Sequence, residues 1–555
     1  MIQKGFFLSG LIFLLTISAC AGHQERAGSE KAQDDPFDVV LPVFSEKDYL
    51  ITDFGALPAL DKLNTQAIND AITRCSEEGG GRVIIPGGLW VTGPIRLRSN
   101  VNLHTEAGAV VLFTEDFSQY PYIRTWFEGR RDYRAMPPLY GDSLENVAIT
   151  GEGVFDGSGD AWRFVKKDKT TQSQWNKLVA SGGYVSEDGR QWWPDEYAYQ
   201  VSRDPDRYRE ILDELPDKEK YKAFYRPALV QLIACDKVLL QGPTFQNSPG
   251  WCIHPLMCTN LSVRGITVKN PWYAQNGDGI DVESCTYVSI KDSYFDVGDD
   301  AICIKSGKDK EGRDRGMPTR YVVVDRCVVQ RGHGGFVVGS EMSGGVKDIW
   351  VSNCSFIGTD VGLRFKSRRG RGGVVENIHI DNIRMVNIDR DAIIFNLFYA
   401  NQAPTEREEY SLEELISDAP EVSEETPAFR NISISGIQCQ NADRALNIMG
   451  LPEMPVKGLK LSSSFFVARQ GIHCLFASDV NMDQVQVLTK NQPTMVLTHV
   501  AGADISGMVG NHEKLAVVAG SSSSDIRILS SDAGPVSGKV EMAKGVPEGA
   551  VSIDK

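Results

Sequence analysis

A short strand pattern recurs along most of this chain, and it constrains the fold more than any other feature. Apolar residues alternate with mostly polar ones over a few positions, which is the period of a half-buried strand. From Val238 to Val480 the first apolar residues of successive copies, called anchors here, are separated by 23, 27, 34, 27, 29, 54, 27 and 21 residues. Steps of this size are typical of stacked supersecondary units. The anchors are Val147, Val238, Leu261, Val288, Val322, Ile349, Ile378, Ile432, Leu459 and Val480.

The repeat favours one architecture over two others. A βαβ solenoid needs a helical pattern within each step, and none is visible. An antiparallel sandwich would not give such even, self-similar spacing. We therefore predict an all-β fold, a single-stranded right-handed parallel β-helix with loops at its corners. The 54-residue step is interpreted as two coils with an insertion.

Other segments interrupt the pattern and set the expected domain boundaries. Residues 65–74 have helical periodicity and could cap the open first coil. A charged, aromatic stretch at about 162–226 is interpreted as a partly helical insertion lying over one face. A smaller acidic insertion covers 405–425. We expect the β-helix domain to span 47–510, and 511–555 to form a last coil and a tail.

The N-terminus has the features of a processing segment. Residues 6–17 are apolar but too short to span a bilayer as a helix. The sequence Ile17-Ser18-Ala19-Cys20 resembles a bacterial lipobox, which implies removal of 1–19 and lipidation of Cys20. The alternative is an ordinary secretory signal that contains a cysteine. Residues 20–46 are expected to form a polar tether.

Ten further cysteines follow Cys20, and five of them recur at fixed distances from the anchors; Cys327 and Cys354 each follow an anchor by five residues. Cys235, Cys258 and Cys285 each precede an anchor by three residues. Because cysteine behaves as a small buried hydrophobe, this recurrence indicates stacked interior thiols that are mostly free. Their spacing does not resemble a zinc site.

The net charge of −15 and pI near 5.2 argue against nucleic acid as a partner. An acidic ligand would also be repelled by the average surface. It would therefore require a local basic cleft.

The strongest candidate for chemistry is a set of aspartates. Asp278 and Asp300 are 22 residues apart, about one coil, and Asp299 adjoins Asp300. Residues one coil apart lie side by side on neighbouring rungs, about 4.8 Å apart. Clustered carboxylates raise one another's pKa, which suits one acid and one base at the same pH. A corner-building role for each aspartate and a calcium site are the alternatives.

Two further motifs follow at intervals of about one coil. His333 lies between two glycines, which let other groups approach closely. Arg364 and Lys366 point to the same face of a strand and could clamp a carboxylate. A structural histidine and a solvated basic edge are the plainer interpretations.

These motifs carry a resemblance to a known family. Asn276-Gly277-Asp278, Gly298-Asp299-Asp300, Gly332-His333-Gly334 and Arg364-Phe365-Lys366 occur in the order and spacing of the four signatures of glycoside hydrolase family 28, the polygalacturonases. The chain resembles bacterial, exo-type members from about Ile51 to Met508. Two positions depart from the usual pattern: Gly277 replaces Thr, and Phe365 replaces Ile. Neither removes a polar group with an assigned role in the chemistry or in carboxylate binding.

The resemblance implies a pectin-lyase-like solenoid that hydrolyses α-1,4-linked galacturonic acid with inversion. Asp299 would be the general acid, and Asp278 and Asp300 would activate water. His333 would tune the acid. Arg364, Lys366, Asn276 and Tyr399 would bind substrate. No metal and no organic cofactor are implied, and we expect a monomer.

Several alternatives stay open at this point. A pectate or rhamnogalacturonan lyase, a rhamnogalacturonan galacturonohydrolase or a non-catalytic glycan-binding β-helix would share the fold. The large aromatic insertion favours exo-action, because it could wall one end of the groove. The lipobox predicts an exported, lipid-anchored protein in the periplasm or on the outer membrane surface of a Gram-negative bacterium, and we favour the periplasm.

Overall fold

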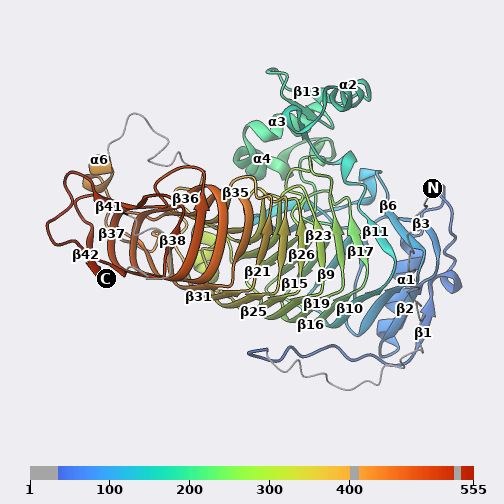
Figure 1. Cartoon of the computed structure of the whole chain (residues 1–555). Coiled ribbons are helices and arrows are strands. Elements are labelled where there is room, and N and C mark those ends of the chain that lie inside the picture. The colour runs from blue at the N-terminus through green and yellow to red at the C-terminus, as the bar shows by residue number, and fades with distance from the viewer. Residues whose placement is uncertain (1–34, 401–411, 530–538, 555) are drawn as a thin grey trace, which may run out of the picture. The chain divides into compact units, whose positions relative to one another are not determined.

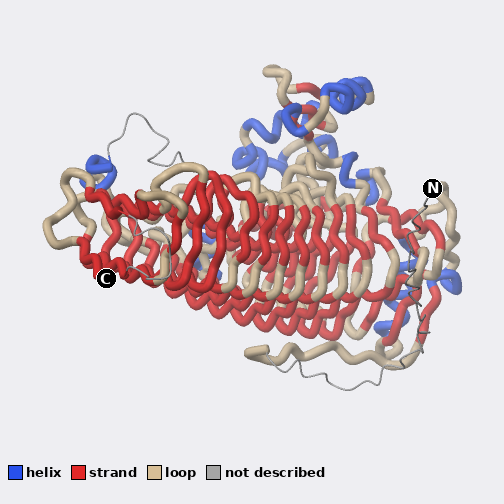
Figure 2. Tube along the Cα trace, viewed as in Figure 1, coloured by secondary structure: helices blue, strands red, loops and turns tan. Residues whose placement is uncertain are grey.

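The computed structural model describes residues 35–400, 412–529 and 539–554. From Phe37 onward they form one compact unit. Its body is a right-handed parallel β-helix, as the repeat predicts: strands of each coil pair in parallel with strands of the coils before and after it (Figures 1 and 2). The predicted lipidation site Cys20 and the predicted signal segment 1–19 lie outside the described residues.

The pairings build three stacks of strands along the solenoid. The first stack carries the anchors: β1 (Asp48–Leu50), β2 (Gly81–Ile85), β5 (Val101–Thr105), β10 (Glu145–Gly151), β16 (Asp236–Gln241), β19 (Thr259–Arg264), β22 (Thr286–Lys291), β25 (Thr319–Asp325), β28 (Val346–Ser352), β31 (Val374–Asp381), β34 (Ala428–Ser435) and the long β36 (Val456–Thr489). The second comprises β3 (Gly88–Thr92), β6 (Ala109–Phe113), β11 (Val154–Asp156), β17 (Thr244–Gln246), β20 (Thr267–Lys269), β23 (Tyr294–Asp296), β26 (Val328–Gln330), β29 (Ser355–Ile357), β32 (Arg384–Val386) and β35 (Gln438–Met449). The third, which carries the candidate site, comprises β4 (Ile95–Arg96), β9 (Leu139–Asp142), β15 (Val230–Ile233), β18 (Ile253–Leu256), β21 (Ile280–Glu283), β24 (Asp300–Lys305), β27 (Gly334–Val338), β30 (Leu363–Lys366) and β33 (Asp391–Asn396), and continues into β35.

The anchors stack directly on one another inside the coil. Val238 pairs with Leu261, Leu261 with Val288, and the series continues to Leu459 with every anchor buried. The residue before each anchor has a positive φ, for example Asn260 at 54° and Asn377 at 57°. This left-handed conformation is least costly for Asn, Asp and Gly. It explains why the polar residue recurs ahead of the apolar one.

The interpretation of the 54-residue step is wrong. Ile378 of β31 pairs directly with Ile432 of β34, so the step is one coil and not two. The additional length lies in a long connection after β33, which includes α6 (Leu412–Ser417). Strand periodicity reports the anchors but not the length of the loops between them.

Parallel pairing also extends beyond residue 510, where we expected a last coil and a tail. β37 (Met495–Ser506) and β38 (Val509–Gly510) are followed by β39 (Lys514–Ala519), β40 (Ser524–Leu529), β41 (Lys539–Met542) and β42 (Val551–Asp554). β39 pairs with β41, and β40 pairs with β42. The solenoid therefore continues to Asp554 in the described residues.

A helix packs on the first coils, where the sequence predicted a cap. Helix α1 (Thr65–Glu77) buries Ala67, Ile68, Ala71, Ile72 and Cys75 in the main core. It contacts strands β1, β2, β4 and β5. Its apolar face thus covers core residues that no preceding coil could cover.

The expected insertion is present and partly helical. It contains β12 (Val165–Lys166), α2 (Gln172–Ala180), β13 (Tyr184–Val185), β14 (Gln191–Trp193), α3 (Glu196–Arg203) and α4 (Pro205–Ile211), and stands on one side of the solenoid (Figure 1). An antiparallel hairpin of β7 (Tyr122–Phe127) and β8 (Arg130–Ala135) packs beside it. Arg209 of the insertion pairs with Asp132 of the hairpin at 3.3 Å.

The described end of the predicted tether lies against the body. Phe37 packs on Tyr287, Tyr321 and Trp350 at centroid distances of 5.8 to 6.0 Å. No helix in the described ranges is long and apolar enough to cross a membrane. The ten cysteines from Cys75 to Cys474 are free and buried, which confirms the predicted interior thiols.

Candidate active site

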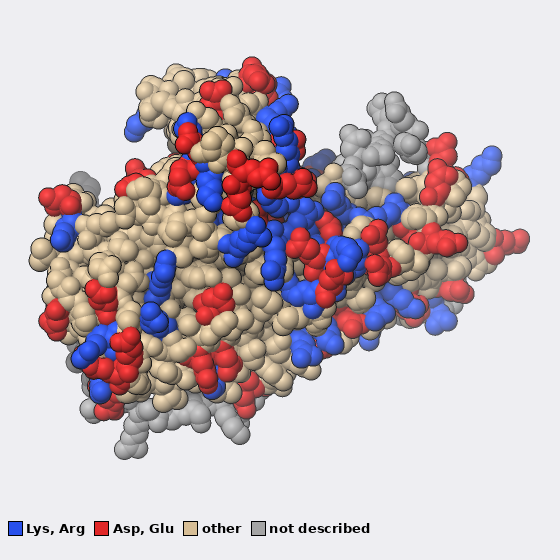
Figure 3. All heavy atoms as spheres, turned by 180° about the vertical axis from the view of Figure 1, so that it is seen from behind, with Lys and Arg blue, Asp and Glu red and all other residues tan. Residues whose placement is uncertain are grey.

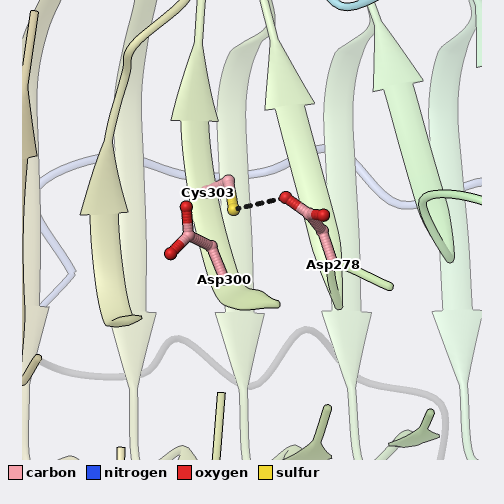
Figure 4. A group of neighbouring side chains, drawn as sticks. All are labelled: Asp278, Asp300 and Cys303. Carbon is pink, nitrogen blue, oxygen red and sulfur yellow. Dashed lines mark hydrogen bonds between the residues drawn. The ribbon is translucent and has the colours of Figure 1, made fainter. Parts of the chain in front are cut away.

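The predicted site residues converge where four neighbouring strands of the third stack begin. Asp278 precedes β21, Asp299 and Asp300 lie at the start of β24, and His333 precedes β27. Ile280 pairs with Ile302, so Asp278 and Asp300 occupy equivalent positions one coil apart. Figure 4 shows the two aspartates on adjacent strands, with Cys303 between them. The 22-residue spacing therefore predicted the juxtaposition correctly.

Asp300 is held as an anion by both predicted clamp residues. Arg364 Nη1 lies 3.0 Å from Asp300 Oδ1, and Lys366 Nζ lies 2.5 Å from Oδ2. Burial raises the pKa of Asp300, but the two cations outweigh it and hold that pKa well below its usual range. The clamp thus neutralises a carboxylate of the protein itself.

Asp278 has the opposite environment. It is buried, its Oδ1 has no hydrogen-bond partner among the described residues, and the Cys303 thiol lies 3.8 Å from Oδ2. Burial raises the pKa of Asp278 well above its usual value, and the negative charges of Asp281 and Asp299 add to the effect. Asp278 therefore favours its protonated form.

Asp299 is the most exposed carboxyl of the three, with 20% of its side chain accessible. Its Oδ1 accepts a hydrogen bond from the backbone N–H of Asp300 at 3.0 Å, and Oδ2 accepts from the N–H of Asn276 at 3.3 Å. Burial raises the pKa of Asp299, but the hydrogen bond from His333 turns the net shift downward. The exposure makes Asp299 the carboxyl best placed to meet a ligand oxygen.

The remaining predicted binding residues border these groups. The ring of Tyr399 lies 5.0 Å from Lys366 Nζ and 5.8 Å from the guanidinium carbon of Arg364, within cation–π range. Asn276 accepts a hydrogen bond through its side-chain oxygen from Arg226 at 2.7 Å. All eight predicted catalytic and substrate-binding side chains thus gather in one site.

A metal is a poor fit to this group. Asp278, Asp300 and Cys303 bring one ligand atom each within 4.8 Å of one another. Calcium prefers six to eight oxygen ligands, but both oxygens of Asp300 already bind cations of the protein. The two carboxyls and one buried thiol do not match that preference.

Comparison with known proteins identifies the family. The model of glycosyl hydrolases family 28 matches residues 213–417, which include every residue from Asn276 to Tyr399. A solved structure of a hyperthermoactive exopolygalacturonase from Thermotoga maritima has a TM-score of 0.67 and 31% identity, covering 82% of this chain and 95% of that chain. This chain belongs to glycosyl hydrolase family 28. It is therefore a glycoside hydrolase, as the four motifs predicted.

Two curated relatives extend the family 28 comparison. A probable polygalacturonase from Vitis vinifera is 28% identical over 423 residues, 74% of this chain and 73% of that protein. An exo-poly-alpha-D-galacturonosidase from Dickeya chrysanthemi is 27% identical over 363 residues, 64% of this chain and 58% of that protein.

One residue of this family 28 site was missed by the sequence analysis. Lys169, in the insertion, places Nζ 3.0 Å from His333 Nε2, while His333 Nδ1 lies 3.2 Å from Asp299 Oδ1. While Lys169 is protonated it has only donors, so Nε2 then accepts and Nδ1–H donates to Asp299. Burial lowers the pKa of Lys169. A lone lysine in a segment without repeats carries no sequence signal for this position.

Replacing Lys169 with methionine is expected to lower kcat about tenfold and to change KM less than twofold, because the imidazole can then adopt the other tautomer and leave Asp299. Histidine ¹⁵N NMR spectra would report the tautomer directly. Lys177→Met, an exposed change on α2, is the control. A variant that raised KM alone would show that Lys169 binds substrate and does not position His333.

Proposed function

We propose that this protein is an exo-acting polygalacturonase that hydrolyses α-1,4-linked galacturonic acid with inversion. The observation that carries the proposal is the convergence of three neighbouring carboxyls with two cations that suit a uronate. The names of the relatives from Thermotoga and Dickeya support exo-action, and the name of the Vitis relative supports polygalacturonase activity.

In this mechanism Asp299 protonates the glycosidic oxygen. Asp278 and Asp300 hold and deprotonate the attacking water, and inversion requires about 6.5–9.5 Å between acid and base carboxyls to accommodate it. Arg364 and Lys366 bind the galacturonate carboxylate at the cleavage point. Asn276 and Tyr399 border the sugar. No cofactor takes part.

Substrate binding itself would prepare the acid and the base. In the free enzyme two cations make Asp300 a weak base. A substrate carboxylate that shares Arg364 and Lys366 withdraws part of their charge from Asp300, which raises its basicity. The same added negative charge raises the pKa of Asp299 and favours its protonated form. The charges of Asp299 and Asp300 both raise the pKa of Asp278, so a change of charge on one of these carboxyls alters the proton affinity of its neighbours.

Exo-action is supported by the insertion, because Lys169 brings it into contact with the catalytic histidine. A segment this close to the cleavage point would obstruct a chain passing through the groove. A rhamnogalacturonan galacturonohydrolase is the alternative within the family.

The test is digestion of polygalacturonic acid and its oligomers by the purified protein without calcium, followed by chromatography of the products. Release of free, saturated galacturonic acid supports exo-hydrolysis. Mixed saturated oligomers would retain the chemistry but contradict exo-action, and unsaturated products would indicate a lyase. Products released only from rhamnose-containing chains would indicate the rhamnogalacturonan galacturonohydrolase.

The protein is also proposed to be exported and anchored through lipidated Cys20, in the periplasm or on the outer membrane surface of a Gram-negative bacterium. The apolar segment and the lipobox-like Ile17-Ser18-Ala19-Cys20 support this location. Metabolic labelling with palmitate tests it, and an unlabelled mature protein would contradict it.

A further inference from the structure

Two neighbouring coils of the first stack carry tyrosines at a position that does not suit them. In the other coils with an anchor, the residue before the anchor is Asn, Asp, Gly or Lys. An asparagine there can also donate a hydrogen bond along the stack, as Asn377 does to Asp348 at 3.0 Å. Tyr287 and Tyr321 adopt the same left-handed conformation, with φ of 57° and 54°. This conformation is costly for a bulky side chain, so the pair requires an explanation.

The two tyrosines belong to an aromatic cradle, a name used here for Tyr287, Tyr321 and Trp350. The tyrosine rings stack with a centroid distance of 5.1 Å and an interplanar angle of 9°. Trp350 lies on β28, one coil beyond Tyr321. Phe37 packs on all three rings at centroid distances of 5.8 to 6.0 Å, within the range in which aromatic rings attract one another. The strained tyrosines are thus the residues that the N-terminal segment contacts.

Residues 37–44 lie along the first stack as an extended segment. Its half-buried side chains alternate with exposed ones, and they are Phe37, Val39, Pro42 and Phe44. The N–H of Val40 donates to the side-chain oxygen of Asn260 on β19 at 3.2 Å, one coil before the cradle. The hydroxyl of Ser45 donates to the carbonyl of Gly80, which precedes β2. The segment therefore follows the stack from the cradle back to the first coil.

The cradle changes where the chain leaves the body. Without docking the chain would leave at Asp48, where β1 begins in the first coil. The docked chain leaves at Phe37, on the coils whose strands β24 and β27 carry the catalytic residues. Phe37 follows Cys20 by 17 residues, which span at most about 60 Å, against about 100 Å for the 28 residues from Cys20 to Asp48. Docking therefore shortens the reach of the chain and moves its origin to the middle of the solenoid.

The cradle and the active site lie on opposite sides of the coil. The catalytic carboxyls lie at the corner between the second and third stacks, and the insertion leaves the coil at the same corner, between β11 and β15. In a coil with three sides, that corner is opposite the remaining side, which is the first stack. Figure 1 shows the docked segment beside the strands labelled β16, β19 and β25, and the insertion with α2 on the opposite side of the body.

The side of the body next to the insertion is rich in cations. Figure 3 shows Lys and Arg side chains gathered there. Anionic lipid headgroups attract such side chains, as an acidic substrate does. A chain that leaves from the end of the solenoid allows this side to turn toward an anionic membrane, where substrate could not reach it. A chain that leaves from the first stack opposes that rotation.

We propose that the aromatic cradle docks residues 37–44 and thereby holds the active site away from the membrane to which Cys20 is proposed to anchor the protein. The orientation rests on the proposed lipidation of Cys20, whereas the docking does not. The tyrosines are retained at strained positions because they bind Phe37.

Cleavage by chymotrypsin after Leu41 tests the docking in the purified protein, because a protease cuts a segment once it is released from the body. Phe37→Ala is expected to raise the rate of this cut about tenfold, as followed by mass spectrometry. Tyr287→Asn combined with Tyr321→Asn should raise it equally, with a Tm no lower than that of Phe37→Ala, since asparagine suits a positive φ. Asp38→Ala, an exposed neighbouring change, is the matched control. Equal rates for Phe37→Ala and Asp38→Ala would overturn the docking.

Energy transfer tests the orientation in the lipidated protein on vesicles of phosphatidylethanolamine and phosphatidylglycerol. The cysteines from Cys75 to Cys474 are buried, so a dye on Lys177→Cys, an exposed position of α2, labels the insertion selectively. Transfer to an acceptor in the bilayer should be weak, and Phe37→Ala should raise it about twofold or more because the chain then leaves from the first coil.

The outcomes separate the docking, the orientation and the anchor. Faster cleavage of Phe37→Ala without a rise in energy transfer overturns the orientation alone. A mature protein that carries no lipid overturns the anchor and the orientation together, and the cleavage rates still decide the docking. Neither measurement depends on the release of galacturonic acid, so failure of the proposed activity is distinguished from failure of this inference.

Discussion

Replacing Asp299 with asparagine is expected to lower kcat about 10³-fold on oligogalacturonates. A general acid contributes about 10²- to 10⁴-fold, and asparagine retains the shape of the side chain but has no carboxyl proton to transfer. Folding should be preserved, because the carboxyl is partly exposed and the hydrogen bonds that it accepts from backbone N–H groups can be retained. Product release measured by chromatography gives the rate.

A substrate with a good leaving group distinguishes the general acid from the general base. A galacturonide of nitrophenol needs little protonation on departure, so Asp299→Asn should hydrolyse it at a rate much closer to wild type. Asp278→Asn should be slow on both substrates if Asp278 activates water. If instead Asp278→Asn hydrolysed the nitrophenyl galacturonide near the wild-type rate and Asp299→Asn were slow on both substrates, Asp278 would be the general acid. The raised pKa of Asp278 already favours its protonated form in the free enzyme. The comparison therefore shows whether Asp299 or Asp278 delivers the proton.

Replacing Lys366 with methionine is expected to damage both stability and catalysis. Lys366 and Asp300 are both nearly inaccessible, so the change leaves a buried anion with Arg364 as its remaining partner. Removing one partner of a buried ion pair lowers the free energy of unfolding by about 3–5 kcal/mol. Because Arg364 still pairs with Asp300, we expect a loss near the lower end, about 3 kcal/mol. KM should rise about 10- to 100-fold, because the substrate carboxylate loses a charged donor. Thermal denaturation and steady-state kinetics measure the two effects.

The stability loss should depend on pH in a defined direction. The pKa of Asp300 is lowered in the folded protein. Its ion pairs therefore contribute fully to the free energy of unfolding above the pKa of an unfolded aspartate, about 3.9, and this contribution is lost as the pH falls through the pKa of the folded state. The difference between wild type and Lys366→Met should therefore be greatest near neutral pH and shrink on acidification. Asp300→Asn combined with Lys366→Met should recover much of the stability but no activity. An equal loss at every pH would contradict the charge pairing and indicate a packing defect.

The repeat predicted the solenoid because inward-facing side chains must stack in register. Val238, Leu261 and Val288 pair directly, as their spacing required. The same register predicted that Asp278 and Asp300 would meet, and it placed Arg364 and Lys366 on one face. For residues of the coil, the number of residues between two positions determines which side chains lie next to each other. The predicted neighbours were therefore correct.

Features outside the coil could not be predicted in this way. Lys169 lies in a connecting segment, where no periodicity relates sequence position to location. The pairing of the clamp with Asp300 was also missed, because the pattern shows which face a cation occupies but not which anion neutralises it. The interpretation of the 54-residue step was wrong for a related reason: a long loop and an additional coil have similar lengths.

The first stack continues without interruption past the insertion. Val147 pairs with Val238 although 90 residues lie between them, just as Val238 pairs with Leu261 across 22. A coil therefore tolerates very different amounts of intervening chain without changing how it docks on its neighbours. Evolution can exchange or enlarge such an insertion while the catalytic strands keep their alignment, and protein engineers can graft new chain-end pockets at the same corner.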